Sequence, residues 1–234
     1  MRKCFIYRIK LSQLVVVLWN NILCCKYSLL LINKIRCIIY LNIRKTYINA
    51  EVWEMLYTYE DAVTKFGSKY LLKKAVGEGD FFQQEKGVYS DTKYVPALQI
   101  ISMKYPKAVF AMDSAFYYHG LTDVIPEKYC IATDRDAAKI CKKNIIQIFE
   151  NKNLLNLGVE QMEREGCVIN IYSKERMLVE LLRHKSKLPF DYYKEILLNY
   201  RDMIHDLDIP LIQDYAYEVP KTSMIMELLQ LEVL

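Results

Sequence analysis

The chain has 234 residues, of which 53% are hydrophobic and 26% charged, with 19 tyrosines and only 7 glycines. This composition excludes a disordered chain, and the length allows one large domain or two small ones. The net charge of +4 hides an asymmetry, because residues 1–50 carry nine of the 32 basic side chains and no acidic one. The rest carries 23 basic against 28 acidic side chains, so any contact with nucleic acid must come from a local basic cluster.

Residues 1–54 form a basic, apolar extension that allows three interpretations. Within residues 11–32 only Lys26 is charged, but polar residues weaken a membrane span, which needs about 20 apolar residues. The segment has the basic start and apolar middle of a signal peptide, but no small-x-small cleavage site follows. The alternatives are a membrane anchor, an appended helix, or sequence upstream of a true start near Met55.

The seven cysteines predict free thiols rather than a disulfide framework. Their number is odd, and none belongs to a CxxC motif, which favours a reducing, cytoplasmic compartment. Together with the three histidines they form no zinc-binding spacing. We therefore expect neither a metal nor a cofactor.

Residues 58–89 predict two short helices followed by a hairpin. Thr58 is placed to cap a first helix that Gly67 ends, and Ser68 to cap a second helix over 69–76. At about 100° per residue, the second helix has one basic arc and one apolar arc. The basic arc is predicted to hold Lys69, Tyr70, Lys73 and Lys74, and the apolar arc Leu71, Leu72, Ala75 and Val76. Gly77 and Gly79 are expected to end the helix, and residues 83–86 to form the tip of the hairpin.

This pattern predicts a winged helix-turn-helix whose second helix enters the major groove of DNA. The predicted DNA-binding residues are Ser68, Lys69, Tyr70, Lys73, Lys74 and Lys86. The alternative is an amphipathic helix with a solvated lysine face. Residues 55–95 hold six basic and six acidic side chains, so binding requires dimerisation or local polarisation of charge.

Residues 96–234 predict a mixture of strands and helices with a helical tail. Residues 159–172 predict a hairpin that turns at Glu165 and Gly166, after which Ser173 caps a helix. Met177, Leu178, Leu181 and Leu182 form the buried stripe of this helix, and Arg176 and Arg183 lie near its two ends. Pro210 suits the first turn of a later helix after Asp208. The last helix is apolar and is expected in the core, with an adaptable partner surface as the alternative.

Ser114, His119 and Asp123 suggest a hydrolase triad, but the sequence favours a structural role. Asp113 or Ser114 is placed as a helix N-cap and Gly120 as the glycine after the helix. No G-x-S-x-G motif is present. We therefore predict that the protein is not an enzyme, and that His119 binds a backbone group or faces a partner.

The order of these segments resembles the AbiEi-type antitoxin family of bacterial toxin–antitoxin systems. Three stretches carry the resemblance: the run from Tyr57 to Tyr89, the stretch PKAVFAMDSAFYYHGLTD over 106–123, and SKERMLVELLR over 173–183. A helical tail follows over 193–231. Departures from the family pattern are Asp113, Glu180, and Gln83 with Gln84, where arginine is common at the wing tip.

The resemblance implies an α+β protein, with a winged helix-turn-helix over 55–95 and a mixed α+β antitoxin domain with a helical tail over 96–234. It implies a cytoplasmic repressor that binds its own promoter DNA and counteracts a nucleotidyltransferase-like toxin in phage defence. The candidate toxin-facing residues are Ser114, His119, Arg176 and Arg183, although surface salt bridges explain the two arginines equally well. The alternative function is a membrane-associated protein anchored by residues 11–32, with a partner-binding body.

Overall fold

The computed structural model describes residues 56–234, which fall within one compact unit of mixed α+β structure. The expectations for residues 1–54, including the membrane anchor and the start near Met55, lie outside the described residues. Within residues 56–234, no helix combines the length and the apolar character that a bilayer crossing requires.

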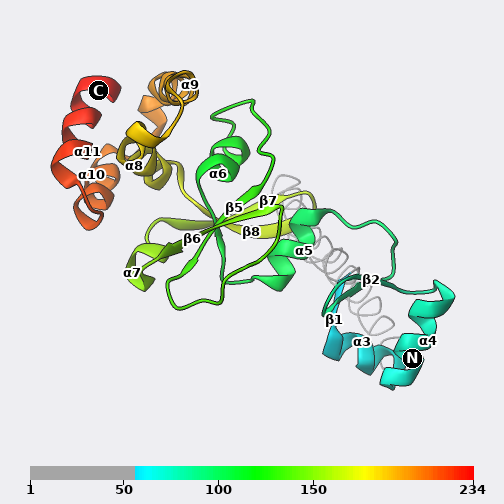
Figure 1. The fold of residues 1–234 in the computed structure, drawn as a ribbon. Helices are drawn as coiled ribbons and strands as arrows, with labels where there is room; N and C mark the ends of the chain where they lie inside the picture. The colour runs from blue at the N-terminus through cyan, green and yellow to red at the C-terminus, as the bar shows by residue number, and fades with distance from the viewer. Residues whose placement is uncertain (1–55) are drawn as a thin grey trace, which may run out of the picture. The chain divides into compact units, whose positions relative to one another are not determined.

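The N-terminal part of the described chain is a small three-stranded antiparallel sheet with two helices (Figure 1). Its elements are β1 (Leu56–Thr58), α3 (Tyr59–Phe66), α4 (Lys69–Glu78), β2 (Phe82–Glu85) and β3 (Val88–Ser90). β3 lies between β1 and β2 in the sheet. The expected order of helix, helix and hairpin is therefore present, and β1 is an additional strand that the sequence did not indicate.

Both helices begin at the predicted caps. The side chain of Thr58 accepts a hydrogen bond from Asp61 N at 3.2 Å, and that of Ser68 accepts one from Leu71 N at 3.2 Å. Gly67 and Gly79 have φ of +79° and +81° at the helix ends, which glycine adopts without steric cost. The prediction that Gly77 ends the second helix is wrong, because α4 continues to Glu78.

The hairpin turns later than the sequence indicated. Gln83, Gln84 and Glu85 lie in β2 rather than at the tip, and the turn falls at Lys86 and Gly87, where φ is +86°. Gln84 Nε2 donates to Ser90 Oγ at 2.7 Å, so its amide is used within the fold. The tip therefore presents Lys86, which is exposed.

An aromatic core joins the two helices to the sheet. Leu72 and Ala75 of α4 are buried against Ala62, Phe81 and Tyr89. Leu71 was predicted on the buried arc, but it is 46% exposed. At 100° per residue Leu71 lies at the edge of the apolar arc, next to Lys74, so the helix buries a narrower stripe than expected.

The larger part of the chain is built on a five-stranded mixed sheet with the order β6-β5-β4-β8-β7. β5 pairs in parallel with β6, β4 in parallel with β8, and the β4–β5 and β7–β8 pairs are antiparallel. The strands are β4 (Val109–Phe110), β5 (Tyr129–Asp134), β6 (Ile145–Glu150), β7 (Val159–Arg164) and β8 (Cys167–Tyr172).

Seven helices of residues 96–234 precede, connect or follow these strands (Figure 1). They are α5 (Ala97–Lys104), α6 (Met112–Tyr118), α7 (Lys152–Leu155), α8 (Lys174–Arg183), α9 (Phe190–Asp202), α10 (Ile209–Glu218) and α11 (Thr222–Leu228). The helices α5, α6 and α7 contact the sheet, and the later ones form the C-terminal tail. α8 packs against α6, α10 and α11. The tail is therefore part of the main core.

Most local predictions for this part are confirmed. The β7–β8 hairpin turns at Glu165 and Gly166, with φ of +48° and +74°. Ser173 caps α8, and Asp208 caps α10 with a proline in the first turn. The predicted cap of α6 is wrong, because the helix begins after Ala111, which makes no side-chain cap.

Two kinds of contact join residues 56–95 to α5 and to the loop before β6. Leu56, Val88 and Ile100 form a small buried cluster. The carboxylate of Glu85 in β2 binds Lys104 of α5 at 2.9 Å and also Lys142, which precedes β6. The boundary proposed at residue 95 is therefore crossed by both apolar and charged contacts.

Candidate functional site

The outer face of α4 carries the predicted basic arc. Lys69, Lys73 and Lys74 are exposed, and Tyr70 is 76% exposed. The opposite side is fixed on the core by Leu72 and Ala75. The helix therefore presents three cations and an aromatic ring on the side opposite its packed face.

Few carboxylates neutralise this face. Lys74 pairs with Glu78 at 3.7 Å, both side chains being about half exposed, so the pair is weak. Across residues 56–234 no carboxylate lies within ion-pair distance of Lys69, Lys73 or Lys86. Within this part of the chain, their charges are therefore not neutralised by an ion pair.

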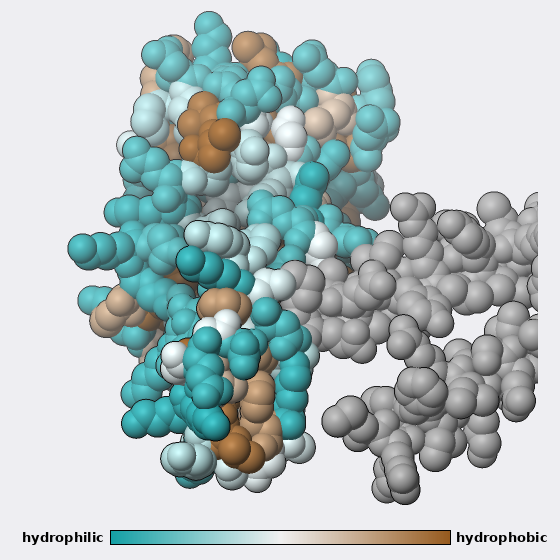
Figure 2. Space-filling view, turned by 90° about the vertical axis from the view of Figure 1, so that its right-hand side faces the viewer, coloured by the Kyte–Doolittle hydropathy of each residue, from teal (hydrophilic) through white to brown (hydrophobic). Residues whose placement is uncertain are grey.

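Figure 2 shows this side of the molecule, where hydrophilic side chains border a narrow hydrophobic strip. Leu71 is exposed on α4 beside the cations. Ser68 holds its hydroxyl at the N-terminus of α4 as the helix cap. Backbone N–H groups at such a terminus favour phosphate, so a capping role and a phosphate contact are compatible for Ser68.

One lysine of this region, Lys65, is already paired within the structure. Lys65 Nζ lies 2.6 Å from Asp91 Oδ1 and donates to Tyr57 Oη at 2.9 Å, while Tyr57 donates to Asp91 Oδ2 at 2.8 Å. Burial by itself lowers the pKa of Lys65, but the hydrogen bonds from Lys65 to Asp91 and Tyr57 outweigh it and raise the pKa. These three contacts connect α3 to the end of β3 and stabilise the small domain against which α4 packs.

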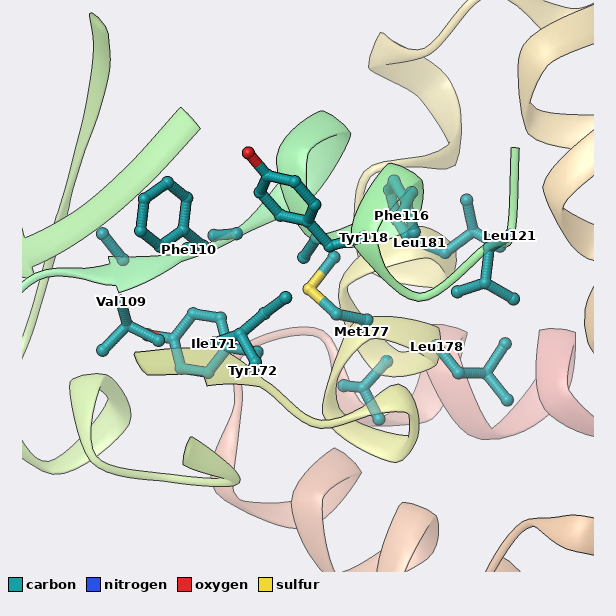
Figure 3. Close-up of a cluster of buried hydrophobic side chains, with 14 of the residues drawn as sticks. Val109, Phe110, Phe116, Tyr118, Leu121, Ile171, Tyr172, Met177, Leu178 and Leu181 are labelled. Atoms are coloured by element: carbon teal, nitrogen blue, oxygen red, sulfur yellow. The ribbon is translucent and has the colours of Figure 1, made fainter. Parts of the chain in front are cut away.

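The predicted toxin-facing residues occupy the interior instead of a surface. Ser114 is fully buried in α6, where its hydroxyl accepts a hydrogen bond from Cys130 N at 2.8 Å. The side chain of His119 is 2% exposed, and its Nε2 donates to Tyr172 O at 2.7 Å. Burial lowers the pKa of His119, which keeps the ring neutral near pH 7. Figure 3 shows apolar side chains of α6, β8 and α8 that pack together in the core, including Phe116, Tyr172 and Met177.

Arg176 and Arg183 belong to a buried charge network centred on Glu180. Arg176 Nη2 lies 2.6 Å from Glu180 Oε1, and Arg183 Nη2 lies 2.8 Å from Glu180 Oε2. Arg183 also binds Glu150 of β6 at 3.1 Å. Burial by itself raises the pKa of Glu180, but the hydrogen bond with His184 and the two arginine charges hold the pKa below its usual value.

Arg176 is the least satisfied member of this network. It is 0% exposed, and its Nε and Nη1 have no hydrogen-bond acceptor among the described residues. Its Nη2 lies within ion-pair distance of Glu180 but makes no hydrogen bond of good geometry there. Its guanidinium carbon lies 5.4 Å from the centre of the Tyr172 ring. Buried donors without acceptors cost free energy, so Arg176 is a structural charge in the core and is not available to a partner.

Burial therefore contradicts a partner-facing role for Ser114, His119 and Arg176, whereas Arg183 remains partly exposed. The reason is tertiary, because α6, α10 and α11 enclose α8 from several sides. The alternative interpretation of His119, a bond to a backbone group, is confirmed. For the arginines, the salt bridges exist but are buried rather than at the surface. The role of Glu150 was missed, since nothing in the sequence links it to Arg183, 33 residues away.

The two buried cysteines of the described residues are poor nucleophiles. Burial raises the pKa of Cys130 to about 12 and that of Cys167 to about 11, so neither is a thiolate near pH 7. Within residues 56–234 no three His, Cys, Asp or Glu side chains gather in a metal-binding arrangement. The α4 face is therefore the strongest candidate site of this part of the chain.

Comparison with known proteins adds no relative: no protein-family model matches the chain, and no curated protein matches it.

Proposed function

We propose that this chain is the antitoxin of a bacterial toxin–antitoxin system and represses transcription from its own promoter. In this proposal residues 55–95 form a winged helix-turn-helix in which α4 enters the major groove and Lys86 at the hairpin tip contacts the backbone. Residues 96–234 counteract a nucleotidyltransferase-like toxin. The proposal rests on the three sequence stretches that resemble AbiEi-type antitoxins, in the order in which they occur.

The observation that carries the DNA-binding part is the α4 face. Three exposed lysines and an exposed tyrosine share one face of a helix whose other face is buried. Two of these lysines have no carboxylate partner among residues 56–234. Lysines that contact phosphates supply affinity without sequence information, and a side chain against a base edge supplies specificity.

The salt dependence of DNA binding tests this proposal. A duplex from upstream of the gene is titrated with the full chain at several salt concentrations. The Lys73→Ala, Lys74→Ala double variant is expected to bind more weakly, with a salt slope smaller by roughly 0.9 for each lost phosphate contact.

A matched control separates contact from net charge. Lys107 and Lys128 are also exposed and lie outside α4, so Lys107→Ala, Lys128→Ala removes the same charge. It is expected to leave affinity and slope close to those of the unaltered chain. Equal slopes for the two double variants would show that α4 makes no direct phosphate contact.

A further inference from the structure

The two edge strands of the five-stranded sheet, β6 and β7, differ in how they are protected. On β7 the charged side chains of Glu160, Glu163 and Arg164 are all exposed, and such charges oppose pairing with a further strand. On β6 the stretch from Ile145 to Phe149 has no charged residue and no proline, and its pairing with β5 is regular, without a bulge. The β6 edge therefore lacks the charge, proline and bulge that commonly keep an edge strand unpaired.

Alternate residues of β6 direct their backbone groups away from β5. The carbonyls of Asn144 and Glu150 accept hydrogen bonds from β5 and from the residue that follows it, both at 2.8 Å. Because the backbone groups of a strand point to its two sides in alternation, those of Gln147 and Phe149 point outward. Among residues 56–234, no backbone group beyond the sheet bonds to either residue. The edge therefore offers donors and acceptors to a further strand.

The side chains at this edge are apolar on both faces of the sheet. Ile146 and Phe149 point to opposite faces, and each is 44% exposed. A strand added at the edge would cover part of both. Removal of apolar surface from water is the main favourable term in most protein association, so side-chain contact would add to the backbone hydrogen bonds.

We propose that β6 pairs with β6 of a second copy of the chain, antiparallel and about a two-fold axis at Gln147. The two Gln147 residues then exchange both backbone hydrogen bonds, and Ile146 of each copy lies opposite Ile148 of the other. Asn144 lies opposite Glu150, so no like charges face each other along the paired strands. A second copy fits this edge because the antiparallel arrangement matches the pattern of outward donors and acceptors to itself and places an apolar side chain opposite each apolar one.

The inference goes beyond the proposed function and does not depend on DNA binding, because its test measures the mass of the assembly. It also bears on the charge of residues 55–95, which hold six basic and six acidic side chains. A dimer doubles the number of phosphate contacts available to such a nearly neutral module.

Sedimentation equilibrium of the full chain at several concentrations is expected to show a dimer. Ile146→Lys removes an apolar contact and adds a charge in both halves of the interface, so it is expected to weaken the dimer by at least about tenfold. Val159→Lys is the matched control, because Val159 is also β-branched and is 36% exposed on the other edge strand. It is expected to sediment as the unaltered chain does. Circular dichroism of each variant checks that it is folded.

Two substitutions of Phe149 separate backbone pairing from side-chain contact. Phe149→Pro removes an outward N–H and leaves the hydrogen bonds to β5 in place. Phe149→Ala removes the ring and keeps the N–H. The proline variant is expected to weaken the dimer about tenfold more than the alanine variant, because each dimer loses two hydrogen bonds.

A chain that sediments as a monomer at every concentration would overturn the inference. A dimer that a folded Ile146→Lys variant leaves intact would place the interface elsewhere, and a dimer that Val159→Lys weakens equally would remove the distinction between the two edges. Equal effects of Phe149→Pro and Phe149→Ala would show that the copies do not pair through the β6 backbone.

Discussion

The buried charge network predicts an asymmetry between its acid and its least satisfied base. Glu180 is the shared partner of Arg176 and Arg183. Replacing it by glutamine leaves Arg176 without any anion among the described residues. Breaking a buried ion pair from one side costs about 3–5 kcal/mol. We therefore expect Glu180→Gln to lower the free energy of unfolding by this amount.

Replacing Arg176 by methionine is expected to change the stability differently. Glu180 keeps Arg183 at 2.8 Å, so its charge stays paired. The change also removes two buried donors that lack acceptors, each worth about 1–3 kcal/mol of penalty. Methionine preserves much of the apolar stem that packs under Tyr172. Arg176→Met is therefore expected to leave the free energy of unfolding nearly unchanged or to raise it. In the double variant with Glu180→Leu, it is expected to restore most of the stability that Glu180→Leu alone loses.

Urea and thermal unfolding followed by circular dichroism give the free energy of unfolding and the Tm of both variants. For a domain of this size about 1 kcal/mol shifts Tm by about 2–4 °C, so Glu180→Gln should lower Tm by roughly 6–20 °C. The native far-ultraviolet spectrum at low temperature is the control for folding. A loss of stability in Arg176→Met as large as that in Glu180→Gln would refute the claim that Arg176 is poorly satisfied.

Three further predictions concern the contacts of Glu85 and the space around two glycines. Glu85→Gln is expected to lose both ion pairs of β2 and to speed tryptic cleavage at Lys93, in the loop that leads to α5. Burial by itself raises the pKa of Glu85, but its two lysine partners hold the pKa below its usual value. The stability that the Glu85 carboxylate contributes is therefore complete above about pH 4.3 and is lost as the pH falls through the lower folded pKa. Acid unfolding of Glu85→Gln, compared with that of the unaltered chain, measures this contribution. Gly158→Ala is expected to cost about 1–3 kcal/mol in urea unfolding, because φ is +69° and the new Cβ meets Arg176 Cβ at 2.7 Å. Gly77→Ala inside α4 meets nothing within 4 Å and is expected to stabilise by about 0.5–1 kcal/mol, so a loss in both variants would contradict the steric argument.

Local signals in the sequence were sufficient to predict the elements that begin at a capping residue or turn at a glycine. The caps at Ser68 and Ser173 and the turn at Glu165 and Gly166 depend on neighbouring residues alone, and all three are observed. β1 was not predicted, because three residues are too few to show an alternating pattern. It pairs with β3, 30 to 34 residues away, so its formation depends on tertiary structure.

The sequence was less informative about which polar residues reach solvent. The helix over 174–183 shows one apolar stripe, so Arg176 was expected at the surface. In the structure every residue from Arg176 to Leu182 is buried, because α10 and α11 return to cover the second face of α8. A helical pattern reports the face that must be buried, and it does not report a second face covered by a distant segment. The α4 face was easier to predict, since only one side of that helix meets a core.

The most direct test of the central claim is whether α4 reads a DNA sequence. Fluorescence anisotropy compares the affinity of the full chain for its upstream DNA with that for a shuffled duplex of the same length. The account predicts tighter binding to the upstream DNA by at least about 10³-fold. It also predicts that Tyr70→Ala reduces this ratio by a base contact worth about 1–3 kcal/mol. Tyr94→Ala, which removes a similarly exposed tyrosine outside α4, should leave the ratio unchanged. Equal affinity for the two duplexes, or the same effect from both tyrosine variants, would contradict the account.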